Sequence, residues 1–340
     1  MKKILLIIFG TFLVISNSNA ESFNTALSKA FKNNSELNAE RENINISEQE
    51  YKISQGNYLP TVTLSGSKSS EDTNKLTNQS GGDATINDVD PLTKSISITQ
   101  TLIDFGRGAE LSKNKIGLEL AKAKLLKKEQ DILYKTTEAY TSLVLANEKL
   151  KINTDNVELL SRQVETDQIR VERGQITLSD VSQSESSLAE AQAKLIQAKN
   201  ELLTSKLNYE NIIGPLTDPK SLNKKTINEY PLPESLDIAI KISKKNNPDL
   251  IIAQLEYERA KKDTVSSRSD LAPTAKLSFD RTKTDDFSST YDERDKDILK
   301  ATITWPFFSG GKNYANLNKS KSLELQKNLL LNNTNKKNQT

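Results

Sequence analysis

Residues 164–188 read VETDQIRVERGQITLSDVSQSESSL and place apolar side chains seven residues apart on both sides of Gly174. The same spacing continues outward in both directions. The ten seam positions are Leu143, Leu150, Val157, Val164, Val171, Val181, Leu188, Leu195, Leu202 and Tyr209. Apolar residues at every seventh position are typical of a coiled coil. Because the two series mirror each other about Ile176, we predict an antiparallel helical hairpin with its tip at residues 174–179.

The limits of the two hairpin helices can also be predicted. No proline occurs from Arg107 to Arg173, so the outgoing helix is predicted to run about 100 Å. Gly174 suits the end of that helix. Ser179 or Asp180 is expected to cap the returning helix, which should end near residues 214–215, a Gly-Pro pair that cannot continue it.

The composition excludes several classes of function. The 340 residues include no Cys and no His, so thiol chemistry, imidazole bases and zinc–thiolate sites are impossible. No P-loop, GxGxxG or GxSxG arrangement occurs. The formal net charge of +2 gives no basic field for nucleic acid. We therefore expect no enzyme activity, no cofactor and no metal.

The N-terminus is typical of a secretory signal peptide. Lys2 and Lys3 precede an apolar run over residues 4–15, and Ser18-Asn19-Ala20 supplies small residues for cleavage after Ala20. A membrane anchor is the alternative, but the run is shorter than the roughly 20 residues that a spanning helix needs. We expect an exported protein.

An internal duplication divides the chain. Residues 26–37 match residues 239–250. In the same order, Pro60-Thr61 matches Pro273-Thr274 and Gly106-Arg107 matches Gly311-Lys312. The predicted domains are a signal peptide at 1–20, a first repeat at 21–214, a linker at 215–234 and an incomplete second repeat at 235–340. Each repeat is expected to begin with a helix, at residues 23–33 and 236–245, followed by a second helix ending near Gly56 and Ser269.

Each half also carries two segments in which apolar and polar residues alternate. Such alternation indicates strands with one apolar and one polar face. It suits either the staves of a transmembrane barrel or a soluble sheet with one buried face. The residues predicted to face lipid are Val62, Leu64, Ile96, Ile98, Leu102, Leu277, Phe279, Ile303 and Trp305. The polar stretches at residues 69–94 and 281–297 are predicted to be solvated loops.

The order of these features resembles TolC-like outer-membrane factors, and several short motifs agree over nearly the whole chain. The motifs are Asn-Asn-Ser-Glu-Leu at 33–37, Asn-Asn-Pro-Asp-Leu at 246–250, Tyr-Leu-Pro at 58–60, Gln-Thr-Leu-Ile-Asp at 100–104 with Gly106-Arg107, the tip at 173–181, and Gly214.

The resemblance implies a mainly α fold with β structure. Four strands per chain and a long coiled-coil hairpin would form a homotrimer with a twelve-stranded barrel in outer-membrane lipid and helices in the periplasm. It implies a passive exit duct of a tripartite efflux or type I secretion system, working with an inner-membrane transporter. A periplasmic adaptor would dock on the tip at Gly174, Gln175, Ile176, Thr177, Leu178, Asp180 and Val181. The family usually has a hydrophobic residue where this chain has Gln175.

Individual side chains leave alternatives open. Asp180 is either a pore-closing residue or a helix N-cap. Trp305, with its neighbours Phe307 and Phe308, belongs either to an interfacial aromatic belt or to the core at a strand-to-helix bend. Arg107 and Lys312 are expected to face solvent.

The second repeat stops before a second long hairpin, which predicts a truncated gene product or an incomplete sequence. A truncated product could lack function. The alternative from another class is a periplasmic coiled-coil adaptor or scaffold that forms no pore.

Overall fold

The computed structural model describes residues 22–72, 89–216, 233–288 and 291–338, with residues 219, 222 and 224. The predicted signal peptide lies outside the described residues, as does most of the predicted linker. The chain divides into two compact units. One comprises Met1–Asn38 and Lys128–Pro231, and the other comprises Ala39–Lys127 and Leu232–Thr340.

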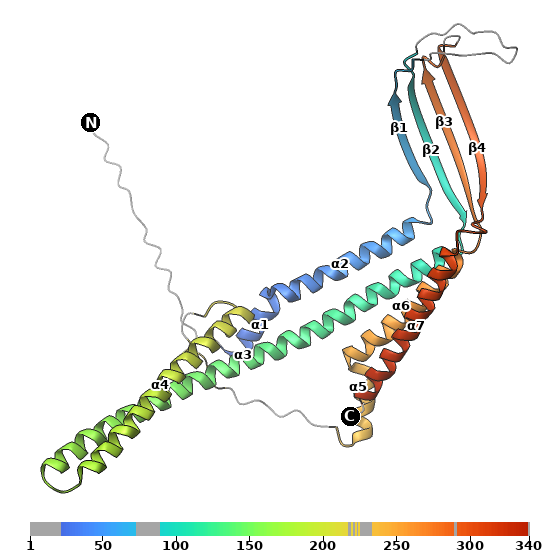
Figure 1. Ribbon diagram of the computed structural model, residues 1–340. Coiled ribbons are helices and arrows are strands. Elements are labelled where there is room, and N and C mark those ends of the chain that lie inside the picture. Colours follow the sequence, from blue (N-terminus) through green and yellow to red (C-terminus); the bar gives the residue numbers. More distant parts are fainter. Residues whose placement is uncertain are drawn as a thin grey trace, which may run out of the picture. The chain divides into compact units, whose positions relative to one another are not determined.

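The first unit contains the long hairpin (Figure 1). Helix α3 (Arg107–Glu172) contributes its later part, and α4 (Leu178–Ile212) returns beside it. Lys149 on α3 pairs with Glu201 on α4 at 2.6 Å, and the register of this pair places the reversal within about a residue of Ile176. The predicted hairpin, the start and end of its outgoing helix and the end of its returning helix are therefore confirmed. Helix α1 (Phe23–Asn33) packs Phe23 edge-on against Tyr140 of α3.

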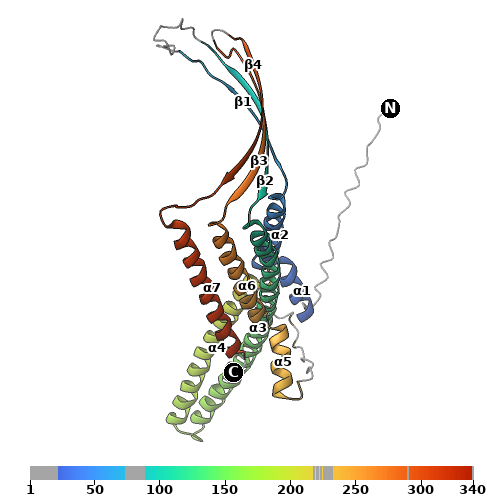
Figure 2. The same ribbon diagram turned by 90° about the vertical axis from the view of Figure 1, so that its right-hand side faces the viewer.

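The second unit contains one four-stranded antiparallel sheet of order β1-β2-β3-β4 (Figure 2). The strands are β1 (Thr61–Lys68), β2 (Leu92–Ile103), β3 (Thr274–Asp285) and β4 (Glu293–Thr304). Helix α2 (Ser35–Gly56) leads into β1 and α6 (Pro248–Ser269) into β3, whereas β2 leads into α3 and β4 into α7 (Lys312–Lys337).

Contacts between neighbouring helices hold this unit together below the sheet. Lys113 of α3 pairs with Asp263 of α6 at 3.0 Å, and Lys327 of α7 pairs with Glu256 of α6 at 2.7 Å. The helices therefore follow the order of the strands that they continue. None of the described helices combines the length and the apolar character needed to cross a membrane.

The helices of the two predicted repeats correspond in length. Helix α1 and α5 (Leu236–Asn246) each have 11 residues, and α2 and α6 each have 22. Pro248 occupies the first turn of α6, where its missing N–H leaves no hydrogen bond unmade. These limits agree with those predicted from the sequence.

The predicted loop at residues 281–297 is wrong, because β3 continues to Asp285 and β4 already begins at Glu293. Ion pairs across the two strands explain the difference. Arg281 lies opposite Asp297, with a Nε–Oδ1 distance of 3.7 Å, and Lys283 pairs with Glu293 at 3.1 Å. Opposite charges on facing strands allow a charged stretch to remain in a sheet. Likewise β2 begins at Leu92, inside the predicted loop at 69–94, of which residues 73–88 lie outside the described part.

Candidate functional site

The end of α3 forms a compact turn at the hairpin tip. Gly174 has a φ of +66°, a left-handed conformation that side chains with a Cβ rarely adopt. Its N–H donates to the Val171 carbonyl, and the Gln175 N–H donates to the Arg170 carbonyl. These two bonds make up a Schellman motif, which satisfies carbonyls left free at a helix end. Gly174 thus sets where the chain reverses.

Helix α4 begins with a reciprocal cap. The Asp180 N–H donates to the Thr177 hydroxyl at 3.3 Å, and the Thr177 N–H donates to the Asp180 carboxylate at 2.8 Å. The N-cap is therefore Thr177, and the prediction of Ser179 or Asp180 at that position is wrong. Thr177 is favoured because its partner three residues later is an acid, which completes a capping box.

The cap also affects the charge of Asp180. The Thr177 backbone N–H, and then its hydroxyl, hold the pKa of the Asp180 carboxyl below its ordinary value. Among the other tip residues, Leu178 is 75% exposed and Gln175 is exposed, whereas Ile176 and Val181 are half-buried. The tip therefore presents one large apolar side chain to solvent beside a polar one.

The burial of the ten predicted seam residues agrees with a contact between α3 and α4, which the Lys149–Glu201 and Asp167–Ser184 pairs mark directly. Leu143, Val164 and Tyr209 are buried, and the other seven are half-buried. Ala191 and Ala198, which follow seam positions on α4, are buried as well. Sequence reasoning missed Asp167, which is only 8% exposed and accepts a hydrogen bond from the Ser184 hydroxyl at 2.6 Å. Its position three residues after Val164 was the available signal.

A second set of apolar side chains on the hairpin is exposed. On α3 and α4 this set comprises Leu145, Ile152, Leu159, Ile196 and Leu203. Its members again lie seven residues apart within each helix. Apolar side chains repeated along an exposed helix face favour contact with another protein surface.

The sheet has one apolar face. Val62 lies opposite Ile98, Ile98 opposite Phe279, and Phe279 opposite Leu299, so one row crosses all four strands. Leu64 lies opposite Ile96, and Leu277 lies in the next row towards the helices. These side chains are exposed or half-exposed, and Leu64 reaches 77%. The strand register therefore places the predicted apolar residues of β1 and β3 on the face that contains Ile96 and Ile98.

A bulge changes the end of β2. Thr101 lies opposite Lys276 and Ile103 lies opposite Ala275, which leaves Leu102 as the additional residue without a ladder partner. Ile103 therefore lies in the row of Ala275 on the apolar face, whereas the alternation of apolar and polar residues in the sequence predicted Leu102 at that position. On β4, Ile303 lies opposite Ala275 and completes this row.

Trp305 follows β4 by one residue and anchors the bend into the next helix. Its indole N–H donates to the Leu271 carbonyl at 3.1 Å, while 60% of the residue is exposed. Its ring meets Phe307 edge-on, and Phe307 and Phe308 are more than 80% exposed. Packing in the core of a single chain is therefore the wrong interpretation of these rings.

The opposite face of the sheet is polar. The Ser65 and Ser95 hydroxyls hydrogen-bond across β1 and β2 at 2.7 Å, and Thr93 and Thr284 do so across β2 and β3 at 3.2 Å. The hydroxyl of Ser97 donates to the carboxylate of Asp280 on the same face. This face is thus suited to contact with water.

Arg107 connects the first strand pair to its helices. Its guanidinium donates to the Asn57 carbonyl at 3.2 Å and to the Thr101 carbonyl at 3.1 Å. It also lies over the Tyr58 ring, 4.8 Å from the centroid. The prediction that Arg107 faces solvent is therefore wrong, because its guanidinium donates to carbonyls just after α2 and near the end of β2. Lys312, its counterpart in the second repeat, is exposed as predicted.

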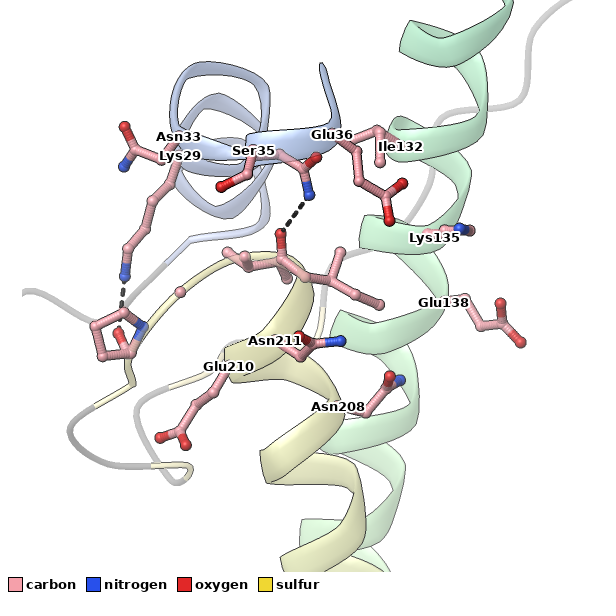
Figure 3. Close-up of a pocket in the computed structure, with 15 residues that line it drawn as sticks. Lys29, Asn33, Ser35, Glu36, Ile132, Lys135, Glu138, Asn208, Glu210 and Asn211 are labelled. Atoms are coloured by element: carbon pink, nitrogen blue, oxygen red, sulfur yellow. Dashed lines mark hydrogen bonds between the residues drawn. The ribbon is translucent and has the colours of Figure 1, made fainter. Parts of the chain in front are cut away.

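Asn34 joins two helix ends. Its side-chain oxygen accepts from the Leu37 N–H at the start of α2, and its amide donates to the Ile212 carbonyl at the end of α4. Lys29 donates to the Pro215 carbonyl beside it at 2.8 Å (Figure 3). These residues border a hollow of about 650 Å³ between the turn from α1 to α2 and the end of α4. Because Lys29 and Asn34 are bound to main-chain carbonyls there, we assign them a structural role.

Known proteins share both the sequence pattern and the fold. The sequence model of the family described as outer membrane efflux protein matches residues 26–215. No curated protein sequence matches the chain significantly.

Solved structures cover nearly the whole chain at low identity. The CmeC outer membrane channel of Campylobacter jejuni is 15% identical, with a TM-score of 0.77 over 92% of this chain and 67% of its own. The outer membrane protein VceC of Vibrio cholerae is 16% identical, with a TM-score of 0.74 over 93% of this chain and 75% of its own. CusC, whose crystal structures are described in terms of folding and transmembrane channel formation, is 16% identical, with a TM-score of 0.75 over 93% of this chain and 72% of its own. The fold is therefore that of TolC-like outer-membrane factors.

Proposed function

Because the chain belongs to the outer membrane efflux protein family, we propose that it is the outer-membrane exit duct of a tripartite efflux system or a type I secretion system. It would pass small molecules or secreted polypeptides without using energy itself. An inner-membrane transporter would drive the flow, and a periplasmic adaptor would connect the two.

The observation that carries this proposal is the sheet with one exposed apolar face and one polar face. A row such as Val62, Ile98 and Phe279 suits contact with lipid, whereas the hydroxyls opposite suit a water-filled interior. Four strands are too few to close a barrel alone. Three copies would supply twelve, which is our reason for proposing a homotrimer.

The exposed apolar residues of the hairpin support association between copies. The Lys149–Glu201 pair marks one face of the hairpin. At about 100° per residue, Leu145 and Ile152 lie on the Lys149 side of α3, whereas Leu203 lies on the side of α4 opposite Glu201. Two different apolar faces can meet head to tail, and such contacts close into a ring.

The hairpin tip is the proposed adaptor contact. Leu178 offers an exposed apolar side chain there, and Gln175 adds a polar group beside it. The remaining tip positions, from Gly174 to Val181, hold the turn in shape. For Asp180 we propose the capping role, because its carboxylate is already bound to Thr177.

The duct can be tested with the exported full chain purified in detergent. We expect a trimer on cross-linking and single-channel conductance in planar bilayers. Ile152→Lys should weaken the trimer by placing a charge in the apolar contact, whereas Thr154→Lys, at an exposed position about 160° around α3 from Ile152, should not. A soluble monomer without conductance would favour the adaptor or scaffold instead.

A further inference from the structure

The polar face of the sheet carries more positive than negative charge. The strand register places four cations on this face, Lys276, Arg294, Lys296 and Lys300, against the single carboxylate of Asp280. Strands β1 and β2 add only hydroxyl side chains, from Thr61, Thr63, Ser65, Ser67, Thr93, Ser95, Ser97, Thr99 and Thr101. All four cations are exposed.

The opposite face differs, because three of the four cations on its described strands have carboxylate partners. Lys94 lies 3.5 Å from Asp285, and Arg281 and Lys283 are paired with carboxylates of β4. These charges therefore largely cancel within the sheet.

On the polar face the lysines have no such partners. Within the part of the chain that the structure describes, neither Lys276, Lys296 nor Lys300 forms an ion pair. Asp280 instead accepts hydrogen bonds from the hydroxyls of Ser97 and Ser278. Arg294 lies over the Phe287 ring, 4.6 Å from its centroid. The positive charge of the three lysines is thus available to a solute.

We infer that the duct favours anionic solutes and that Lys276, Lys296 and Lys300 determine this preference. The inference rests on the proposed function, since the polar face becomes the interior only when the sheets of several copies close. Each copy would then repeat the three lysines around the bore. Rings of basic side chains select anions, because they raise the local concentration of negative charge.

The test is the reversal potential of the full chain in planar bilayers across a KCl gradient. We expect chloride to be more permeant than potassium. The preference should be clear near 0.1 M salt, where the Debye length is about 10 Å, and should fade near 1 M, where it is about 3 Å. Replacing the three lysines together by glutamate should invert the sign of the reversal potential, and replacing them by arginine should preserve it.

Lys68→Glu is the matched control, because Lys68 lies on the apolar face in the register with Leu92. It makes one Lys→Glu change away from the interior and should leave the permeability ratio unchanged, whereas any one of the three interior lysines replaced in the same way should shift it towards potassium. A conducting pore that prefers potassium, or that ignores the triple glutamate change, would overturn this inference alone. A trimer that conducts no ions would instead contradict the proposed duct, and the selectivity with it.

Discussion

The hydroxyl of Ser184 donates a hydrogen bond of 2.6 Å to the carboxylate of Asp167 between the two hairpin helices. Asp167 is buried, and the one ion pair that it forms with another described residue, Arg170, is long at 3.9 Å. Removing the hydrogen-bond donor of a buried carboxylate lowers the free energy of unfolding. The seam is therefore more than an apolar contact near the tip, since it includes a polar pair that fixes the register.

We expect Ser184→Ala to destabilise the tip half of the hairpin by about 1–3 kcal/mol, because the buried carboxylate loses its neutral donor. Hydrogen exchange of the hairpin amides measures this local effect. Ser182→Ala is the control, because the Ser182 hydroxyl is exposed and bonds only to its own helix, so a change within about 0.5 kcal/mol is expected. Equal protection in both variants would show that the pair contributes nothing.

Replacing Gly117, within α3, and Gly174, just after its end, by alanine should change the free energy of unfolding with opposite signs. Gly174→Ala places a Cβ at a φ of +66° and should cost about 1–2 kcal/mol. Gly117 lies within α3, and an added Cβ there meets no atom within 4 Å. Gly117→Ala should therefore stabilise by about 0.5–1 kcal/mol. Hydrogen exchange near each site gives both values, and a gain at Gly174 would contradict the assignment of the turn.

The capping box predicts a pH dependence of the tip. The pKa of Asp180 is lowered by folding, so its contribution is present above the ordinary carboxyl pKa and is lost as the pH falls through the lowered value. Asp180→Asn removes this contribution. Comparing amide protection in the two proteins at each pH cancels the intrinsic exchange rates. The difference at the start of α4 should be largest near neutral pH and should shrink in acid, and a constant difference would argue against the charged cap.

Arg107 predicts a difference between the two repeats. Arg107→Lys keeps the charge but cannot reach both the Asn57 and Thr101 carbonyls, so we expect a loss of about 1.5–3 kcal/mol. Lys312→Ala is the counterpart, and we expect almost no change because the Lys312 side chain is exposed. Thermal unfolding of the detergent-purified protein compares the two. A larger effect at Lys312 would contradict the structural role of Arg107.

The helices could be predicted closely because their limits depend on local chemistry. Proline at 248 and at the strand entries, and glycine at 174 and 214, stop or start helices without help from distant residues. The seven-residue spacing then fixed the reversal near Ile176. Strands β3 and β4 were only partly predicted. On the face that is apolar in the half of each strand nearer the helices, the half farther from the helices carries charged residues instead.

What the sequence could not provide depends on register between distant segments. The Arg107 guanidinium reaches a carbonyl 50 residues away in the chain. The partners of Arg281 and Lys283 become visible only when β3 and β4 are aligned. The bulge between Thr101 and Ile103 exchanges two adjacent apolar residues, which alternation alone cannot distinguish.

Neighbouring positions on β2 provide the sharpest test of the two sheet faces. Ile98 lies between Val62 and Phe279 on the apolar face, whereas Thr99 lies between Thr61 and Ser278 on the polar face. If the apolar face meets lipid, Ile98→Lys should destabilise the inserted barrel by about 2–4 kcal/mol for each copy near the middle of the bilayer. Thr99→Lys adds the same charge to the proposed interior and should be tolerated.

The measurement is the amount of heat-resistant oligomer in the outer-membrane fraction. We expect it to fall sharply for Ile98→Lys and to remain near the unsubstituted level for Thr99→Lys. The two changes share their strand, their depth and their introduced charge, so a difference between them reports only the side of the sheet. Equal accumulation of both variants would mean that neither face contacts lipid, and the sheet would then have to be covered by protein.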